Sequence, residues 1–494
     1  MKSYRKISIV ALLTAVAMAG VSCKGCGSPP VAVPTYEEAV TENWRSFVSA
    51  GQYVGAAAVL LKLNGEVSGP GLSGQQIGRI AGSPCQESLS YLANQYLDDD
   101  AVRNALNLVR AGVQDPPPGY ADGNPWKSAT TDELVLKMLN FFAGWCTSLP
   151  RINGSYDNGL NEIQEISWLY YHNQAGQDFV QGRDPANRDQ KLITGWKFTK
   201  DFTLQLGAFM DSPASDTYLQ EWVDDPAIEI TDYQRQTYVQ YDSWNDFFSR
   251  ELITDTANQT IPSRPVTMPD RDYVVVAPTD CIMNSLVQVL DSGGEKKRKI
   301  LENPLQYDTV LDVKGIPISL DQLLTGVDED LRQQFVEGSG QSCVLMPNTY
   351  HRFHAPVDGK VVYSDVVEQN TFGYFDWPNW VPSTGNVGEP GTDFSQFEMY
   401  QRGIVIMEVT YDNLIEKDHK AYVAVIPVGL ESVGSVVLRV KKGDMVKKGY
   451  TELGNFYYGG SLNIILYSKG LASGVTHVRM GNQINVFNLG KKIE

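Results

Sequence analysis

Histidine is scarce in this chain, and two of its five histidines lie in the short segment Tyr350-His351-Arg352-Phe353-His354. An imidazole titrates close to neutral pH, so a histidine pair beside an arginine indicates proton transfer. In an extended segment, positions three apart point to opposite faces, whereas in a turn they can converge. A purely structural pair is the competing interpretation. A zinc site would need further ligands, and no Cys/His cluster stands nearby.

A second candidate is a serine that follows two glycines, Gly459-Gly460-Ser461. Glycine adopts backbone conformations that other residues rarely reach, so this segment can be a simple turn before a strand. Alternatively, the Ser461 hydroxyl attacks the carbonyl of Gly460. A serine hydrolase using Ser461 and His354 is a third interpretation, but it lacks a G-x-S-x-G elbow and leaves the glycine pair unexplained.

A third candidate is Asp280, which ends an apolar run at 276–279. An aspartate in this place can orient a histidine, as in a catalytic triad. Taken alone, it is also a common turn residue.

The elements that must position these residues differ between the two halves of the chain. Apolar and amphipathic runs in the first half predict helices, and Thr130 with Glu133 resembles a capping box. The Trp and Phe residues here, at helical spacing, are expected in the core. The expected helices cover residues 36–50, 87–96, 101–113, 134–145, 161–173 and 200–210.

The residue pattern changes near residue 270, where short β-rich runs are separated by Gly, Pro, Asp and Asn. The sequence therefore predicts an α+β protein, with a helical domain at 34–235 and a β-rich domain at 240–494. The segment 371–397 is expected to be a long loop, which is uncommon unless functional. The expected strands cover residues 273–277, 344–346, 360–364, 403–409, 421–428, 433–440 and 462–467.

The N-terminus has the features of a targeting segment. Basic residues precede an apolar stretch at 7–19 that is too short to span a bilayer well. We expect residues 1–22 to be a leader and Cys23 to be lipidated; plain secretion after cleavage near Ala19 is the alternative. In both cases the mature protein would act outside the cytoplasm, as a membrane-anchored lipoprotein or in the periplasm.

The overall charge excludes some classes of partner. The 494 residues carry a formal net charge of −17, and no block of Lys and Arg is present. A nucleic-acid partner is therefore not expected, and simple electrostatic docking on an anionic membrane is disfavoured. The six cysteines have no framework spacing, so Cys85, Cys146, Cys281 and Cys343 are expected to be small buried apolar residues.

In their order along the chain, these segments resemble the phosphatidylserine decarboxylase family. The resemblance covers about residues 240–470, and the helical half is similar to the extra domain of fungal tryptophan decarboxylases around residues 206–215. The matching segments are 243–252 (SWNDFFSREL), 263–266 (SRPV), 277–280 (APTD), 350–359 (YHRFHAPVDG), 425–435 (VIPVGLESVGS), 442–444 (KGD) and 453–461 (LGNFYYGGS).

The resemblance implies a self-cleaving proenzyme. Asp280, His354 and Ser461 would form the cleavage triad, and the chain would be cut between Gly460 and Ser461. Ser461 would become a covalent pyruvoyl group, the pyruvate-type cofactor that holds a substrate amine while CO2 leaves. His351 would take part in decarboxylation and in reprotonation. The two fragments are expected to stay associated, and a homodimer is compatible with the sequence.

Two positions depart from the family pattern. Cys281 follows Asp280 where Gly is usual, and Leu462 follows Ser461 where Thr or Ser is common. Both put the efficiency of processing in doubt and are the support for an alternative, a non-catalytic exported binding protein with the same fold. The substrate is either phosphatidylserine or a free L-amino acid, and the acidic chain with its helical domain favours a free, aromatic amino acid.

Overall fold

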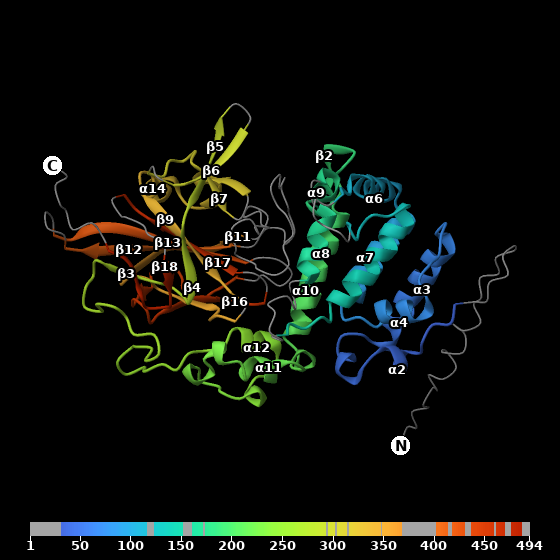
Figure 1. Ribbon diagram of the computed structural model, residues 1–494, viewed down its shortest axis with the longest axis horizontal. Coiled ribbons are helices and arrows are strands. Elements are labelled where there is room, and N and C mark those ends of the chain that lie inside the picture. Colours follow the sequence, from blue (N-terminus) through green and yellow to red (C-terminus); the bar gives the residue numbers. More distant parts are fainter. Residues whose placement is uncertain are drawn as a thin grey trace, which may run out of the picture.

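A helical part and a β-rich part lie side by side in the computed structural model of the chain (Figure 1). The leader, Cys23, Gly460 and the loop expected at 371–397 lie outside the residues that the structure describes. The described residues are 31–115, 123–151, 161–170, 173–292, 295–301, 304–313, 316–346, 348–367, 402–412, 417–429, 436–458, 461–469 and 476–486.

The helical part confirms the predicted character of the first half. Thr130 accepts a hydrogen bond from the Glu133 backbone and so opens the helix predicted at 134–145. The helices are α2 (Tyr36–Ala39), α3 (Ala50–Glu66), α4 (Gly74–Ala81), α5 (Gln86–Asp98), α6 (Asp100–Gly112), α7 (Thr131–Trp145), α8 (Asn161–Tyr170), α9 (Gln174–Val180), α10 (Thr194–Met210), α11 (Leu219–Val223) and α12 (Trp244–Phe248). Between them lie a small hairpin, β1 (Arg183–Asp184) and β2 (Asn187–Lys191), and the 3-10 turns η1 (Glu42–Trp44), η2 (Pro213–Ser215), η3 (Pro226–Ile228), η4 (Ile230–Asp232) and η5 (Tyr238–Gln240).

The continuous helix predicted at 36–50 is wrong. α2 ends at Ala39 and a 3-10 turn follows, and the long helix α3 begins only at Ala50. Ser49 is the reason, because its hydroxyl accepts from the Gln52 backbone while the Gln52 side chain accepts from the Ser49 backbone. This capping box starts a helix at the point where the apolar pattern was expected to end one.

Aromatic side chains fill the core of the helical part, as predicted. The Phe142 ring lies 4.9 Å from that of Phe198 and 4.8 Å from that of Phe202, both edge-on. Two cysteines correct the prediction, because Cys85 and Cys146 form a disulfide that joins the start of α5 to the end of α7. Cysteine spacing could not show this, since the pairing depends on how the helices pack.

The β-rich part is built from short strands with a few helical turns. The strands are β3 (Val274–Val276), β4 (Cys281–Ser285), β5 (Val287–Ser292), β6 (Glu295–Ile300), β7 (Val310–Val313), β8 (Ile316–Ser319), β9 (Ser339–Leu345), β10 (Arg352–His354), β11 (Gly359–Val367), β12 (Arg402–Tyr411), β13 (His419–Gly429), β14 (Val436–Leu438), β15 (Met445–Val446), β16 (Glu452–Phe456), β17 (Ser461–Tyr467), β18 (Thr476–Val478) and β19 (Gln483–Val486). The helices are α13 (Leu320–Leu323) and α14 (Glu329–Gln333).

An eight-stranded sheet organises this part, in the order β15-β11-β12-β13-β17-β9-β4-β18. β17 lies inside the sheet, antiparallel to β13 on one side and to β9 on the other, with seven residue pairs in each register. Smaller sheets flank it: β10-β16-β14, β19-β3 and β6-β5-β7-β8.

Both faces of the large sheet are buried. Side chains alternate along each strand, so neighbouring residues pack into cores on opposite faces. On β17, Leu462, Ile464 and Leu466 pack into one apolar core. Ile465 and Tyr467 pack into the other, which is continuous with the core of the helical part. Ser461 is an even number of residues from Ile465 and Tyr467, so its side chain lies on the same face as theirs.

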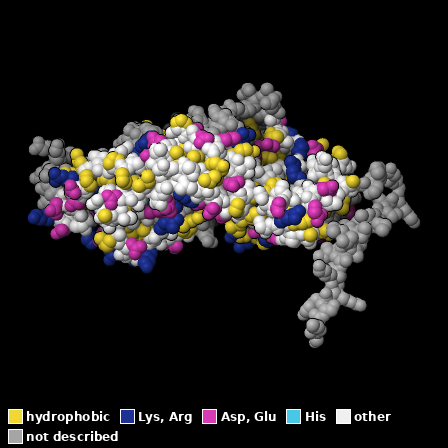
Figure 2. Space-filling model, turned by 90° about the horizontal axis from the view of Figure 1, so that it is seen from below, with side chains coloured by type: hydrophobic (Ala, Val, Ile, Leu, Met, Phe, Trp, Pro, Cys, Tyr) yellow, Lys and Arg dark blue, Asp and Glu magenta, His cyan; other side chains and the backbone are white. Residues whose placement is uncertain are grey.

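The surface shows no area dominated by one charge on the face drawn in Figure 2, where Lys and Arg are mixed with Asp and Glu. Within the described ranges, no helix combines the length and the apolar composition that crossing a bilayer requires.

Candidate functional site

Ser461 is the first residue of β17, so the sheet fixes its place. It pairs with Gly429 of β13 and with Leu345 of β9, and the residue is only 2% exposed. Its hydroxyl has no hydrogen-bond partner among the residues that the structure describes. A buried hydroxyl without a partner costs free energy and needs an explanation, of which a catalytic role is one.

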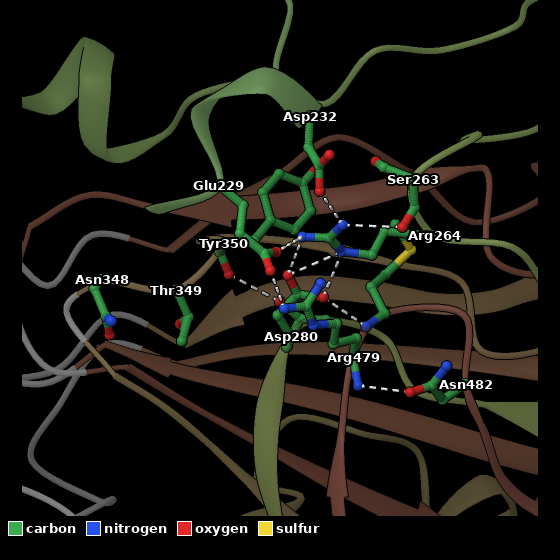
Figure 3. A network of polar contacts seen from close by, with 12 residues as sticks. Glu229, Asp232, Ser263, Arg264, Asp280, Asn348, Thr349, Tyr350, Arg479 and Asn482 are labelled. Atoms are coloured by element: carbon green, nitrogen blue, oxygen red, sulfur yellow. Dashed lines mark hydrogen bonds and ion pairs between the residues drawn. The ribbon is translucent and has the colours of Figure 1, made fainter. Parts of the chain in front are cut away.

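Asp280 lies at the turn between β3 and β4, where an arginine holds its carboxylate (Figure 3). The Nε of buried Arg264 lies 3.0 Å from each carboxylate oxygen, and its Nη2 lies 2.8 Å from Oδ2. The backbone N–H of Met480 donates to Oδ1 at 2.7 Å. Both oxygens of Asp280 are therefore engaged.

Arg264 also connects Asp280 to segments far away in the sequence. It pairs with Asp232 at 2.6 Å and with Glu229 at 3.4 Å, and Glu229 in turn pairs with Arg479 (Figure 3). The resulting network joins the segment before α12, the β3–β4 turn and the C-terminal strands. A planar guanidinium with a fixed fork of donors is suited to such a junction.

The ring of His354 is oriented by two tyrosines. Its Nδ1 lies 2.9 Å from the Tyr450 carbonyl, and its Nε2 lies 2.8 Å from the Tyr350 hydroxyl. A carbonyl can only accept, so Nδ1 carries the proton and Nε2 accepts from Tyr350. Burial lowers the pKa of His354, while the Tyr450 carbonyl acts in the opposite direction. The ring is therefore a neutral base.

The expected bond between Asp280 and His354 is not formed in the part of the chain described. Arg264 and the Met480 backbone occupy the carboxylate, and Tyr450 occupies the nitrogen of His354 that Asp280 would meet. The two residues are nevertheless neighbours, because the His354 backbone N–H donates to Pro278 at 2.7 Å. The structure thus brings these two residues of the predicted triad together without joining their side chains.

His351 meets a different set of residues. Its ring stacks on Phe248 of α12 with 3.7 Å between centroids, and its Nδ1 has no partner within the described ranges. Burial lowers the pKa of His351 well below its usual value, and the Arg250 charge lowers it further. The imidazole is therefore neutral at neutral pH and free to accept a proton at Nδ1.

The short helix α12 connects His351 to the segment that precedes Ser461. Phe248 lies edge-on to Tyr458 with 5.4 Å between centroids, and Trp244 lies 5.6 Å from the same ring. The Tyr458 backbone N–H donates to the Asn245 side chain at 3.1 Å. A segment more than 200 positions earlier thus anchors the chain three residues before Ser461.

The two departures from the family pattern are both buried in the sheet. Leu462 lies on the opposite face of β17 from Ser461 and packs in that core. The thiols of Cys281 and Cys343 are free, as expected of small buried apolar residues. Burial raises the pKa of Cys281 well above its usual value, which keeps the thiol protonated and inert.

Sequence reasoning missed several residues of this site. Arg264 lies in a matching segment but had no assigned role, and its ion pairs depend on the fold. Asn463 and Arg250 also escaped notice, although both side chains are buried and have polar atoms without partners among the described residues. No group of three or more His, Cys, Asp or Glu side chains in the described ranges is arranged to hold a metal ion.

Comparison with known proteins places this site in a class of enzyme. Residues 244–486 match the family model of phosphatidylserine decarboxylase. The phosphatidylserine decarboxylase proenzyme of Fusobacterium nucleatum is 28% identical over 275 residues, which are 55% of this chain and 74% of that protein. The C-terminal part of the chain therefore belongs to the phosphatidylserine decarboxylase family, as the sequence predicted.

Two fungal relatives extend the comparison. Phosphatidylserine decarboxylase proenzyme 3 of Schizosaccharomyces pombe is 26% identical over 56% of this chain, which spans only 24% of that protein. Decarboxylase iboD of Amanita muscaria is 26% identical over 46% of this chain and 58% of its own length. All three relatives are named as decarboxylases, which are carboxy-lyases, and this confirms the expected enzyme class.

Proposed function

We propose that this chain is a self-processing decarboxylase that converts its own Ser461 into a pyruvoyl group. The observation that carries the proposal is the buried hydroxyl of Ser461 at the start of an internal strand, which has no partner among the described residues. Two glycines precede it in the sequence, and glycine can adopt backbone conformations that other residues rarely reach.

The self-cleavage begins with attack of the Ser461 oxygen on the carbonyl carbon of Gly460. The C–N bond breaks, the nitrogen gains a proton, and an ester replaces the amide. Loss of the Cα proton then expels the carboxylate of Gly460, and water converts the remaining dehydroalanine into a ketone with release of ammonia. His354, a neutral base, is the proposed acceptor of the hydroxyl proton. Its Nε2 becomes available once the hydrogen bond from the Tyr350 hydroxyl is broken.

The position of Ser461 fits the group. A pyruvoyl at the start of β17 would be held by the backbone pairing of that strand with β13 and β9. When formed, its ketone supplies an electron sink that binds the substrate amine and accepts the electrons released as CO2 leaves. His351 is proposed to take up a proton at Nδ1 and pass it to Cα, and Phe248 keeps its ring in place.

Two substrate classes fit this function. The names of several relatives support phosphatidylserine. The extra helical part and the acidic chain support a free L-amino acid, with an aromatic one favoured. Purified protein incubated with L-tryptophan in one arm and phosphatidylserine vesicles in the other separates the two by the CO2 released.

Intact mass tests the proposal itself. The wild-type chain should yield a fragment of residues 461–494 that is blocked at its N-terminus, and Ser461→Ala should stay whole. Ser285→Ala, a strand serine in β4, serves as the matched control and should be cut normally. An uncut wild-type chain with no carbonyl that hydroxylamine can trap would refute self-processing and favour a binding protein with this fold.

We also propose that the protein is exported and lipidated at Cys23. The basic start and short apolar stretch of the leader support this localisation. Labelling cells with a fatty acid should mark the wild-type chain and leave Cys23→Ala unlabelled. Equal labelling of both would exclude Cys23 as the acceptor.

A further inference from the structure

Asn463 lies beside Ser461 on the same face of β17. The two are separated by one residue, and the register of β17 with both neighbouring strands is regular through this stretch. Since strand side chains alternate, positions 461 and 463 point the same way, about 7 Å apart along the strand. Asn463 is thus the next side chain along from the proposed reactive group.

The side-chain amide of Asn463 is buried and makes no hydrogen bond to the residues that the structure describes. The residue has 0% exposure, and neither Oδ1 nor Nδ2 has a partner in the described part of the chain. Its cross-strand neighbours are Cys343 of β9 and Pro427 of β13. Of their side chains, only the Cys343 thiol can form a hydrogen bond, and a weak one. An apolar residue would be more stable here, so the polar side chain indicates a role outside folding.

The chemistry of an amide defines the ligand that would satisfy it. An asparagine offers two N–H donors and one carbonyl acceptor side by side. An α-amino-acid head group offers the complement, because its nitrogen donates and its carboxylate accepts through atoms joined by a single carbon. A substrate held by its nitrogen at position 461 has its carboxylate within reach of the next side chain on that face.

We propose that Asn463 binds the α-amino-acid head group of the substrate and selects for the carboxylate. The proposal rests on the proposed function, because it takes position 461 as the place where the substrate nitrogen lies. Free amino acids and phosphatidylserine share this head group, so Asn463 would serve either source. Asn463 is then a substrate-binding residue and takes no part in self-cleavage.

The variant Asn463→Leu tests this, since leucine has a similar size and no polar atoms. The control is Ile465→Val, a change of one methyl group on the same strand and the same face. We expect both variants to be cut between residues 460 and 461 to the wild-type extent. We expect the thermal midpoint of unliganded Asn463→Leu to be equal to or higher than that of the wild type, because an unsatisfied buried amide is removed.

Binding is measured by titration calorimetry on protein treated with borohydride, which prevents turnover. The probes are two matched pairs: L-tryptophan with tryptamine, and O-phospho-L-serine with O-phosphoethanolamine. The pair that binds identifies the source of the head group. Wild type and Ile465→Val should prefer the carboxylate-bearing member by about tenfold or more, as expected for a hydrogen bond to a charged group, and Asn463→Leu should lose this preference.

Three outcomes overturn the proposal: an unchanged preference in Asn463→Leu, no carboxylate preference in the wild type, or a clearly lower thermal midpoint for Asn463→Leu with unchanged binding. An uncut wild-type chain would refute the proposed function and not the role of Asn463. In that case the same titrations on the uncut chain still decide whether Asn463 recognises the head group.

Discussion

His351 and His354 are three positions apart, and their rings lie in different surroundings. β10 is extended from Arg352 to His354, so the two side chains do not converge as they would in a turn. His354 lies between Tyr350 and Tyr450, whereas His351 stacks on Phe248. This separation is consistent with two tasks, one in making the cofactor and one in using it.

Replacing His351 should leave self-cleavage intact and impair turnover. In His351→Ala the residues assigned to cleavage are unchanged, but the proposed proton donor is gone, which typically costs about 10²–10⁴-fold in rate. Denaturing gels report the cut, and CO2 release reports turnover. His419→Ala, at the start of β13, is the control and should keep both. Wild-type turnover in His351→Ala would remove His351 from the reaction.

The pH dependence of self-cleavage follows from the lowered pKa of His354. The ring must be neutral to accept a proton, so the cleavage rate should be constant above about pH 6.5, the ordinary histidine value, and should fall only below it. A time course on newly synthesised chain at several pH values measures this. A rate that already falls between pH 8 and about pH 7 would contradict a depressed pKa.

The lowered pKa values of His351 and His354 also predict how the stability of the fold depends on pH. The unfolded chain takes up protons near pH 6.5, whereas folded His351 and His354 do so only at lower pH. The unfolded state therefore binds more protons below that value, and the free energy of unfolding should decrease as the pH falls.

Part of the site could be predicted from sequence at this scale and part could not. Ser461, His351 and His354 stand in short motifs of unusual composition, and all three side chains are buried within this assembly. Asp280 was identified too, but its ion pair with Arg264 spans 16 positions and has no signature in spacing. Asn463 carries no motif, since its importance depends on burial and missing partners.

At the level of elements, the Arg264 network holds together segments that lie far apart in the sequence. Asp232 and Glu229 come before α12, Asp280 follows β3, and Arg479 with Met480 follows β18. The turn that carries Asp280 is therefore complete only when the C-terminal strands are in place.

Removing the Arg264 charge should disturb both folding and cleavage. In Arg264→Met the buried Asp280 carboxylate loses its partner, and breaking such a pair typically costs about 3–5 kcal/mol. Arg264→Lys keeps the charge without the fork of donors and should lie between methionine and wild type. Urea unfolding of the uncut Ser461→Ala background measures stability, and gels on the single variants measure cleavage.

Arg439→Met is the control for this experiment. Arg439 pairs with Glu452 but is 44% exposed at its side chain, and such pairs contribute at most about 1 kcal/mol. A loss in Arg264→Met no larger than in Arg439→Met would show that the network does not support Asp280.

The strands of the sheet were easier to predict than its small elements. The runs at 403–409, 421–428 and 462–467 are nearly all apolar because both faces of the sheet are buried, and each became a strand. β6, with the sequence EKKRKI, has no such signal and was missed. The helix α3 was also missed, since its glycines and alanines give a weak amphipathic pattern.

At the scale of the whole molecule, the two halves share a continuous apolar core. Phe142 and Leu206 of the helical part and Val425 and Ile465 of the sheet belong to it. The α+β class followed from the change of residue pattern near residue 270. How the halves pack could not be predicted, because it depends on contacts such as those of α12 with Tyr458. The domain limits at 34–235 and 240–494 stay predictions.

The central place of β17 leads to a last prediction about the cut protein. Cleavage before Ser461 leaves the seven-pair registers of β17 with β13 and β9 intact, and β18 and β19 still pair with β4 and β3. The fragments should therefore elute together in gel filtration and separate only in a denaturant. Concentrated salt should not release the small fragment, because backbone pairing and apolar burial are not screened as surface charges are. Separate elution under native conditions would mean that β17 is not held inside the sheet after the cut.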